Sequence, residues 1–385
     1  MSLSGATILQ VIPRLDTGGA ERTTLEVAEA LIAAGAKAVV VSAGGRLEGE
    51  LTRLGAELIK IDHAGTKNPI RLYGNAGVFS RIISGYKVDL VHARSRAPAW
   101  SALWAARRMK KPFVTTYHGV YNAKSPPKRF YNSVMARGDV VIANSEFTAA
   151  HVRQEHPSAA DRIVTIPRGV DIKRFDPDRI TPSRRAALAK EWRVEPDTIL
   201  IVLPARLTGW KGHREAIAAA ALLRDRPGPS WRMVFAGDAQ GRRGYVEELS
   251  ELIASHSLDG RVAMVGHCDD MPAAFALANI VIAPSNEPEA FGRVAAEAGA
   301  MGAPVIGSSI GAQGEIIEAG RTGLIVPPLD PPALAAAMAD LLDRGPEGRE
   351  AMGAAARARI RERFTTSALQ QATLAVYDRL IGRPA

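Results

Sequence analysis

Short apolar runs alternate with helical patterns along the whole chain, and this alternation restricts the possible folds more than any other feature. The first run, residues 6–13, is typical of a strand, and the pattern over 20–34 is typical of a helix that ends at Gly35. Repeated alternation of this kind predicts parallel sheets covered by helices on both faces. Further strands are expected at 38–42, 58–61, 90–92, 113–117, 140–144 and 163–167, and then at 199–204, 231–236, 262–265, 279–283, 304–307 and 323–326.

A stretch rich in charge, proline and aspartate interrupts the alternation at residues 168–182. Since 385 residues suggest two domains, we expect a Rossmann-like domain over 1–170, a linker over 171–182 and a second Rossmann-like domain over 183–364. The predicted fold class is therefore α/β, with two doubly wound parallel sheets. Ligands of such sheets bind beyond the carboxyl ends of the strands, so we expect a site in a cleft between two facing domains.

Composition bounds the cellular setting. No run of about 18 uncharged apolar residues is present, so the sequence predicts no transmembrane helix. The first residues lack the basic start of a signal peptide. Cys268 is the only cysteine, so an intrachain disulfide is impossible, which fits a reducing compartment. We expect a cytoplasmic protein.

The net charge of +9 is concentrated in the first half of the chain. Residues 1–170 carry 23 Lys and Arg against 13 Asp and Glu, a net of +10. Residues 87–137 alone hold 11 basic residues and one acid, Asp89. Such a segment attracts the phosphates of lipids, lipid-linked sugars or nucleic acid, although a solvated basic face remains open as an alternative. The candidate acceptor or membrane patch comprises Arg94, Arg96, Arg107, Arg108, Lys110, Lys111, Lys124, Lys128 and Arg129.

In the second half, residues 287–297 combine several ligand-binding groups in one short segment. Glu289 follows the apolar run 280–284, and Glu297 falls about one turn into the next helix. Between them, the amides near Phe291 and Gly292 lie at the helix N-terminus, where unpaired N–H groups favour an anion. The segment therefore offers a carboxylate for sugar hydroxyls, amides for a phosphate and a second carboxylate for a ribose diol.

Two cations, Arg206 and Lys211, follow the strand expected at 199–204. At the carboxyl end of a strand they can grip a diphosphate, Arg through a bidentate fork and Lys as a point charge. Fixed cations stabilise a departing nucleoside diphosphate without a metal ion. The eight histidines form no metal-binding motif, so we expect no metal and no cofactor. Exposed basic residues in a loop are the alternative.

The first half offers a glycine pair and a histidine at strand ends. Gly18 and Gly19 sit between the first strand and the first helix, where glycine lets the backbone approach a ligand closely. The stretch lacks the third glycine of a dinucleotide-binding fingerprint, which disfavours a nicotinamide oxidoreductase. His118 ends the strand 113–117 and is expected to point into the cleft, unless it is a capping or core histidine.

The segment 287–297 and its continuation 298–306 resemble the E-x7-E motif of family 4 glycosyltransferases. The residues 205–212 resemble the G-R-L-x-x-x-K-G element of that family, with Ala205 in place of the first glycine, and 116–119 resemble its T-x-H-G element. The resemblance implies two Rossmann-like domains of the GT-B type. It also implies that the last helix, 365–381, packs back onto the N-terminal domain.

The resemblance assigns expected roles. Glu289 and His118 are the expected catalytic residues. Glu297 is expected to hold the ribose, and a backbone contact near Gly266 to hold the base. The expected donor-binding residues are Gly18, Gly19, Arg206, Lys211, Gly266, Phe291, Gly292, Arg293 and Glu297.

The implied reaction is retaining, front-face transfer of a hexose from GDP-mannose or a UDP-hexose to a hydroxyl of an envelope glycolipid or polysaccharide. The sequence around Glu289 resembles that of lipopolysaccharide-core mannosyltransferases, which implies an anionic glycolipid or oligosaccharide acceptor and a peripheral place at the inner membrane. A sugar-nucleotide epimerase of the same fold remains an alternative. A protein that binds nucleic acid or membranes through its basic patch is another, although no nucleic-acid-binding motif is present and we expect no nucleic acid partner.

Overall fold

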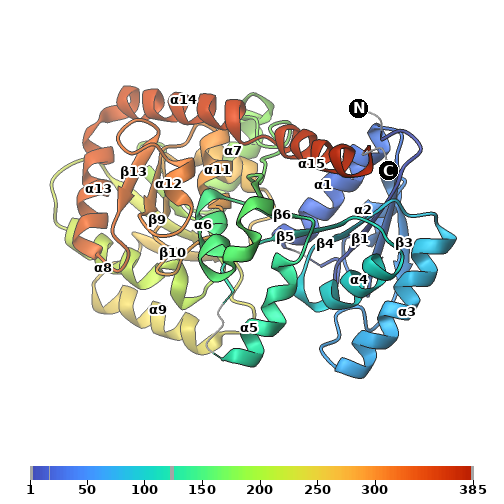
Figure 1. Ribbon diagram of the computed structural model, residues 1–385. Helices are drawn as coiled ribbons and strands as arrows, with labels where there is room; N and C mark the ends of the chain where they lie inside the picture. The colour runs from blue at the N-terminus through green and yellow to red at the C-terminus, as the bar shows by residue number, and fades with distance from the viewer. Residues whose placement is uncertain (1–2, 17, 122–124, 383–385) are drawn as a thin grey trace. The chain divides into compact units, whose positions relative to one another are not determined.

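The computed structural model describes residues 3–16, 18–121 and 125–382 (Figure 1). The chain divides into two compact units. Unit 1 extends through Gly169 and includes the C-terminal segment from Thr366, and unit 2 comprises Val170–Thr365. The C-terminal segment thus belongs with the N-terminal unit, as the resemblance implies.

Unit 1 is built on a seven-stranded sheet in the order β3-β2-β1-β4-β5-β6-β7. Every pairing is parallel, as the alternation of strands and helices predicts. The register pairs Ile8 of the central strand with Ala38 on one side and Leu90 on the other. The strands are β1 (Thr7–Val11), β2 (Lys37–Ser42), β3 (Glu57–Lys60), β4 (Leu90–Ala93), β5 (Phe113–Tyr117), β6 (Val140–Ala143) and β7 (Ile163–Thr165).

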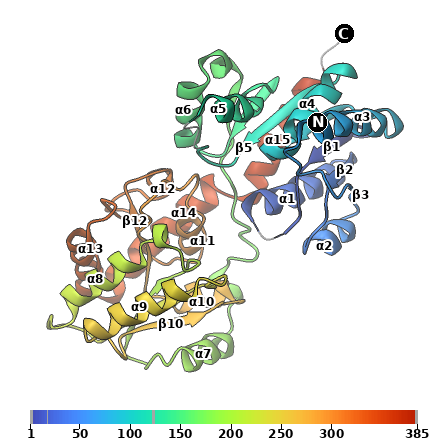
Figure 2. The same ribbon diagram turned by 90° about the horizontal axis from the view of Figure 1, so that it is seen from below.

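Helices cover both faces of this sheet because successive strand side chains point to opposite sides. Leu9 packs with α3, α4 and the end of α6, whereas Ile8 packs with α1, α2 and α15. Helix α15 lies beside α1 in both views (Figures 1 and 2). The helical segments are α1 (Gly19–Ala33), α2 (Glu48–Arg53), α3 (Pro69–Gly85), α4 (Arg96–Arg108), α5 (Pro126–Asn132), η1 (Ser133–Ala136), α6 (Glu146–Glu155), η2 (Pro157–Arg162) and α15 (Thr366–Ile381).

Unit 2 repeats the architecture with a six-stranded parallel sheet in the order β10-β9-β8-β11-β12-β13. The strands are β8 (Ile199–Leu203), β9 (Trp231–Ala236), β10 (Val262–Gly266), β11 (Ile280–Ala283), β12 (Val305–Ser308) and β13 (Gly323–Val326). The helical segments are η3 (Pro177–Arg179), α7 (Pro182–Glu191), η4 (Gly209–Lys211), α8 (His213–Leu223), α9 (Arg243–Ser255), α10 (Met271–Leu277), α11 (Arg293–Ala300), α12 (Gln313–Ile316), α13 (Pro331–Asp343) and α14 (Gly345–Arg363).

Residues 171–182, which the sequence suggests as a linker, are packed as part of unit 2. Phe175 and Ile180 are buried in a core cluster with Trp192 and Phe275. Asp176 and Asp178 both accept hydrogen bonds from the Arg357 guanidinium, at 2.7 and 2.8 Å. The segment is held in place by the burial of its apolar side chains and by these charge-assisted hydrogen bonds, in which the carboxylates of Asp176 and Asp178 are the acceptors.

Each sheet reverses its strand order at one point, and that point locates the crevice where open α/β sheets bind ligands. In unit 1 the reversal lies between β1 and β4, and in unit 2 between β8 and β11. The loops that leave β8 and β11 therefore meet at one edge of the unit 2 sheet. Across the described part of the chain, none of the helices combines the length and the apolar character needed to cross a bilayer.

Candidate functional site

The loops after β8 and β11 bring Lys211 and Glu289 into direct contact. The Lys211 Nζ donates to Glu289 Oε1 at 2.6 Å, and the two side chains are only 14% and 10% exposed. The hydroxyl of Ser285 donates to the same Oε1 at 2.5 Å. Because both contacts are made by Oε1, the carboxylate is held in one orientation. The sequence predicts both residues as site residues, but it does not predict that they pair.

A glycine on a third loop supports the main chain of Glu289. Gly311 forms a parallel bridge with Glu289 and has a φ of +78°, which favours glycine. A Cβ at this position would lie 2.5 Å from both the N and the O of Glu289. The amide of Ala312 donates to the Glu289 carbonyl at 2.8 Å. The loop after β12 therefore fixes the backbone from which the Glu289 side chain projects.

Helix α11 begins directly after this carboxylate. Its N-cap, Gly292, has a φ of +89° and contributes no side-chain cap, so the first amides of the helix are left for other acceptors. The Phe291 ring is buried and packs edge-on against Phe364 at 6.1 Å, so only the main chain of Phe291 can contact a ligand. Within the helix, Arg293 Nη1 donates to Glu297 Oε1 at 3.3 Å.

The remaining predicted donor-binding residues of unit 2 lie at strand ends. Arg206 is exposed after β8, and its Nη1 is 3.4 Å from Gln240 Oε1. Gly266 ends β10 with a φ of +76°. The strand order places β8, β9 and β10 side by side, so both residues belong to the same edge of the sheet as Lys211.

In unit 1, His118 follows β5 and contacts Arg168, which follows β7. The Arg168 Nη2 lies 3.1 Å from His118 Nδ1. A guanidinium only donates, so Nδ1 is the acceptor and the neutral imidazole carries its proton on Nε2. Burial, assisted by the charges of Arg168 and Arg94, lowers the pKa of His118 well below its usual value. The buried Nε2–H, which has no partner in the described part of the chain, is therefore a donor in a fixed tautomer.

The same arginine lies against the glycine pair. A Cβ on Gly19 would fall 1.7 Å from Arg168 Nη1, so the guanidinium occupies the space that any other residue would need. Gly18 is the N-cap of α1 and provides no side-chain cap. The structure thus brings Gly18, Gly19 and His118 together around Arg168. The sequence places Arg168 at the domain boundary without giving it a site role.

Arg94, which was predicted to belong to the basic surface patch, is buried. It is only 1% exposed, and its Nε and Nη2 donate to Gln10 Oε1 at 2.8 and 2.6 Å. Next to it, His92 Nδ1 lies 2.5 Å from Tyr377 Oη and His92 Nε2 lies 2.7 Å from Thr116 Oγ1. Arg94 therefore belongs to a buried polar layer that accompanies the packing of α15 on the sheet, and assigning it to a surface patch was wrong.

The other patch residues divide into groups with different surroundings. Arg107 pairs with Asp139 at 2.8 Å, and Lys111 with Asp89 at 3.8 Å. Lys110 is exposed, and Arg108 lines a hollow with Trp104 between α3 and α4. Lys124 lies outside the described residues.

Arg96 and Lys128 line a second, larger pocket of about 690 Å³. Lys67, which the sequence did not single out, lies in the same wall, and Tyr121 and Tyr131 supply aromatic surface. The Arg96 guanidinium is stacked over the Tyr121 ring at 4.0 Å. No acidic side chain is among the described residues that line this basic pocket. Arg129, also predicted for the patch, lines a different pocket, together with residues of α6.

Among residues 3–16, 18–121 and 125–382, no group of three or more His, Cys, Asp and Glu side chains could hold a metal ion. The absence of a metal requirement stays a prediction.

Two family models match the chain in sequence. The model described as Glycosyltransferase Family 4 matches residues 17–174, and that described as Glycosyl transferases group 1 matches 185–359. Among curated relatives, the D-inositol 3-phosphate glycosyltransferase of Pseudarthrobacter chlorophenolicus is 32% identical over 62% of this chain and 59% of its own length, which is less than two thirds. The enzyme of the same name from Xylanimonas cellulosilytica is 31% identical over 75% of this chain and 71% of its own.

Solved structures agree with these matches. A glycosyltransferase from Rickettsia africae superposes with a TM-score of 0.92 at 34% identity, covering 99% of this chain and all of that one. Anabaena HepE in complex with UDP and glucose superposes with a TM-score of 0.82 at 24% identity, covering 97% and 100%, a likeness of fold alone.

Proposed function

The chain belongs to glycosyltransferase family 4, and from that premise we propose that it is a retaining hexosyltransferase that uses a nucleotide-diphosphate sugar and needs no metal ion. The observation that carries this proposal is the Lys211–Glu289 contact at the strand-order reversal of unit 2. A largely buried cation and a largely buried carboxylate, next to helix amides that no side chain caps, match a phosphate bonded to a hydroxyl-rich ring.

The proposed roles follow from these groups. Lys211, Arg206 and the first amides of α11 hold the diphosphate and stabilise the charge that develops as it departs. Glu289 accepts hydrogen bonds from sugar hydroxyls, and Glu297 from the ribose. The sugar–phosphate bond breaks, the bond from the sugar C1 to the acceptor oxygen forms on the same face, and the acceptor's proton passes to the leaving phosphate. Holding the two substrates in register supplies much of the rate.

His118 is proposed to act as a hydrogen-bond donor and not as a base. Its Nδ1 is occupied by Arg168, and its Nε2 already carries a proton. The low pKa keeps the ring neutral at physiological pH, so Nε2–H can donate to a substrate oxygen without adding a charge. This assignment leaves the leaving phosphate as the proton acceptor.

The acceptor is proposed to carry a phosphate or another anionic group. The basic pocket, with Lys67, Arg96 and Lys128 in its wall, supports this class because its described lining holds cations, hydroxyls and aromatic rings but no carboxylate. The names of the first relatives add support, since a D-inositol 3-phosphate glycosyltransferase acts on a phosphorylated polyol. Transfer of mannose to a lipopolysaccharide core stays a prediction within this class.

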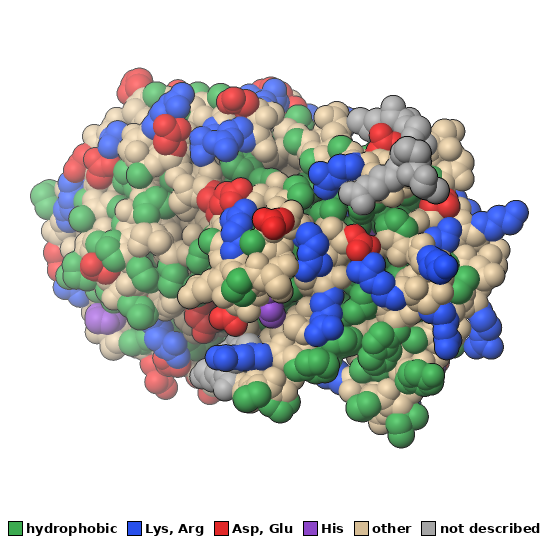
Figure 3. Space-filling model, in the orientation of Figure 1, with side chains coloured by type: hydrophobic (Ala, Val, Ile, Leu, Met, Phe, Trp, Pro, Cys, Tyr) green, Lys and Arg blue, Asp and Glu red, His purple; other side chains and the backbone are tan. Residues whose placement is uncertain are grey.

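We also propose that unit 1 docks on an anionic membrane surface, at the inner membrane, through the α3–α4 face. Ile70, Tyr73 and Trp104 are exposed there, beside Arg108. In Figure 3 hydrophobic side chains gather over the lower end of α3, with Lys and Arg side chains around them. An exposed apolar patch with a basic margin fits the interface of a bilayer rich in anionic lipids.

The reaction is tested with purified protein, GDP-mannose and UDP-hexoses in EDTA, with phosphorylated polyols and anionic glycolipids as acceptors. We expect one donor to be consumed and the new linkage to keep the donor's anomeric configuration, read from the anomeric proton. An inverted product would contradict the retaining mechanism. Conversion of the nucleotide sugar without any acceptor would indicate an epimerase instead.

Membrane docking is tested by sedimentation with phosphatidylglycerol vesicles. Sedimentation of the variant that combines Tyr73→Ser with Trp104→Ser is expected to decrease, and unchanged sedimentation would contradict docking by this face.

A further inference from the structure

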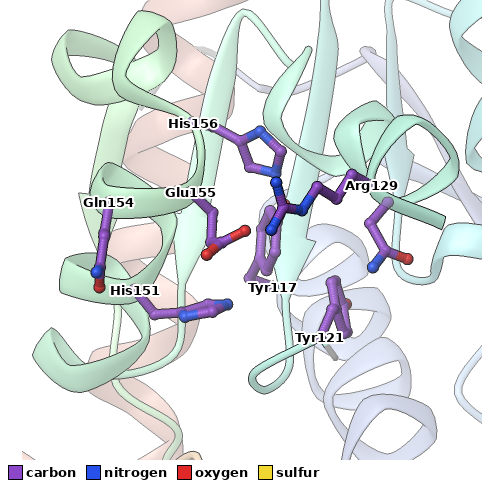
Figure 4. Close-up of a pocket in the computed structure, with 8 residues that line it drawn as sticks. Tyr117, Tyr121, Arg129, His151, Gln154, Glu155 and His156 are labelled. Carbon is purple, nitrogen blue, oxygen red and sulfur yellow. The ribbon is translucent and has the colours of Figure 1, made fainter. Parts of the chain in front are cut away.

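Unit 1 contains a second polar pocket, which shares Tyr121 with the basic pocket. It has a volume of about 210 Å³ and is bounded by the end of β5, by α5 and by α6. We call it the α5–α6 pocket. Figure 4 shows Arg129 entering from α5, Tyr117 from the end of β5, and His151, Gln154 and Glu155 from α6. Arg129 was predicted for the basic patch, and the other four side chains have no site role assigned above.

The wall of this pocket includes a tyrosine hydroxyl that lacks a protein partner. Tyr117 is 2% exposed, and its buried Oη has no hydrogen-bond partner among the residues that the structure describes. Its ring stacks on Tyr121 at 4.8 Å, which fixes its position. Burial raises the pKa of the phenol, so the hydroxyl stays protonated and available as a donor.

A second wall residue presents an amide donor. Asn132 is 3% exposed, and its Oδ1 accepts a hydrogen bond from Arg96 Nη1 at 2.8 Å. Because a guanidinium cannot accept, this bond fixes which end of the amide faces Arg96. The opposite end, Nδ2, is buried and finds no partner within residues 3–16, 18–121 and 125–382. Buried polar groups are costly when unpaired, so a bound molecule that carries hydrogen-bond acceptors would satisfy both donors of this pocket wall.

The rim of the pocket selects against charged ligands. In Figure 4 the guanidinium of Arg129 and the carboxylate of Glu155 point toward one another above the Tyr117 ring. An anion would be opposed by Glu155 and a cation by Arg129. A hydroxyl can donate to the carboxylate and accept from an amide or a guanidinium, so a polyol matches both. Arg129 is exposed on α5.

We propose that the α5–α6 pocket binds an uncharged sugar unit of the acceptor, beside the basic pocket that takes the acceptor's anionic group. Tyr121 lines both pockets, so they adjoin one another. A volume of 210 Å³ is what roughly seven water molecules occupy in the liquid, and this size suits a single sugar ring. The acceptor class is then a saccharide in which an uncharged residue lies next to a phosphorylated one. This inference rests on the proposed transferase function.

The test measures, by saturation-transfer NMR, whether three neutral glycosides bind to the whole protein. They are methyl α-D-glucopyranoside, methyl α-D-mannopyranoside and methyl α-D-galactopyranoside. Tyr117→Phe removes the hydroxyl and keeps the ring, and Asn132→Asp removes the donor and keeps the oxygen that faces Arg96. Tyr245→Phe is the matched control, since Tyr245 Oη is also buried without a partner but lies in unit 2.

At least one glycoside is expected to bind, with its Kd raised about tenfold by either substitution in the pocket, the effect of one strong hydrogen bond, and unchanged in the control. The midpoint of thermal unfolding, Tm, should not fall in Tyr117→Phe, because the hydroxyl that is removed had no partner among the described residues. Absence of binding to the wild type would overturn the inference. So would binding that is lost on Glu289→Gln but kept in both pocket variants, since the sugar would then occupy the donor site. Consumption of a donor sugar in the same preparation would show that the transferase function stands even if the pocket proposal fails.

Discussion

Replacing Lys211 by methionine tests the central contact of unit 2. Coulomb's law gives about 6 kcal/mol for unit charges 2.6 Å apart at an effective dielectric constant of about 20, an upper bound on the interaction. Removing one partner of a buried pair costs about 3–5 kcal/mol, since the other charge is left uncompensated. Ser285 still donates to Glu289, so we expect the lower end, about 3 kcal/mol.

Stability and catalysis should separate in the double variant. Lys211→Met with Glu289→Gln leaves no buried charge, so its free energy of unfolding should return to within about 1 kcal/mol of the wild type. Transfer should nevertheless stay about 10²–10³-fold slower in both variants, because the cation beside the leaving phosphate is missing.

The assay is urea unfolding followed by tryptophan fluorescence, together with initial rates of donor consumption. Trp192, Trp210 and Trp231 lie in unit 2, and the Lys211 Nζ lies over the Trp210 ring at 4.0 Å, so the signal includes a reporter beside this site. Because the chain has two compact units, we expect more than one unfolding transition, and the comparison uses the transition of unit 2. A single variant that loses less than about 0.5 kcal/mol, or a double variant that is no more stable than the single one, would refute the reasoning.

Three further predictions concern other parts of the molecule. In Arg168→Met the His118 ring should no longer be held in the tautomer protonated on Nε2, and the pKa of His118 should rise. The ¹⁵N NMR shifts of the imidazole report both changes, and unchanged shifts would count against the assignment. Gly311→Ala should destabilise unit 2 by about 2 kcal/mol or more and weaken donor binding, because its Cβ meets the Glu289 backbone at a positive φ, whereas Gly314→Ala, where space is open, should be nearly neutral in calorimetric unfolding. Burial lowers the pKa of His213 to about 4, so the unfolded chain takes up a proton near pH 6.5 before the folded one does. The free energy of unfolding should therefore fall by roughly 3 kcal/mol between pH 6.5 and 4, and His213→Asn should flatten that slope in urea titrations.

The strands could be predicted from the sequence because parallel strands buried on both faces give continuous apolar runs. Residues 113–117 and 231–236 match β5 and β9 to the residue. Glu289 and Lys211 stood out because they follow such runs at the carboxyl ends. Their pairing could not be predicted, since it depends on β8 and β11 being neighbours, and strand order is set by long-range packing.

The roles of two arginines could not be predicted from the sequence, because they depend on burial and on contacts with distant residues. Arg94 lies in a basic run and reads as a surface residue, but its partner Gln10 is 84 positions away on another strand. Arg168 was passed over because its contacts with His118 and Gly19 also join distant loops. A short motif reports local geometry, whereas these contacts exist only after the sheet has formed.

Calorimetric titration of UDP and GDP into the wild type and Glu297→Ala, in EDTA, tests the central claim most directly. The account predicts that one of the two nucleotides binds without metal and that the substitution weakens it about tenfold or more, the loss of a carboxylate that holds the ribose. Binding of neither nucleotide to the wild type, or equal binding to both proteins, would contradict the assignment of the donor site to unit 2.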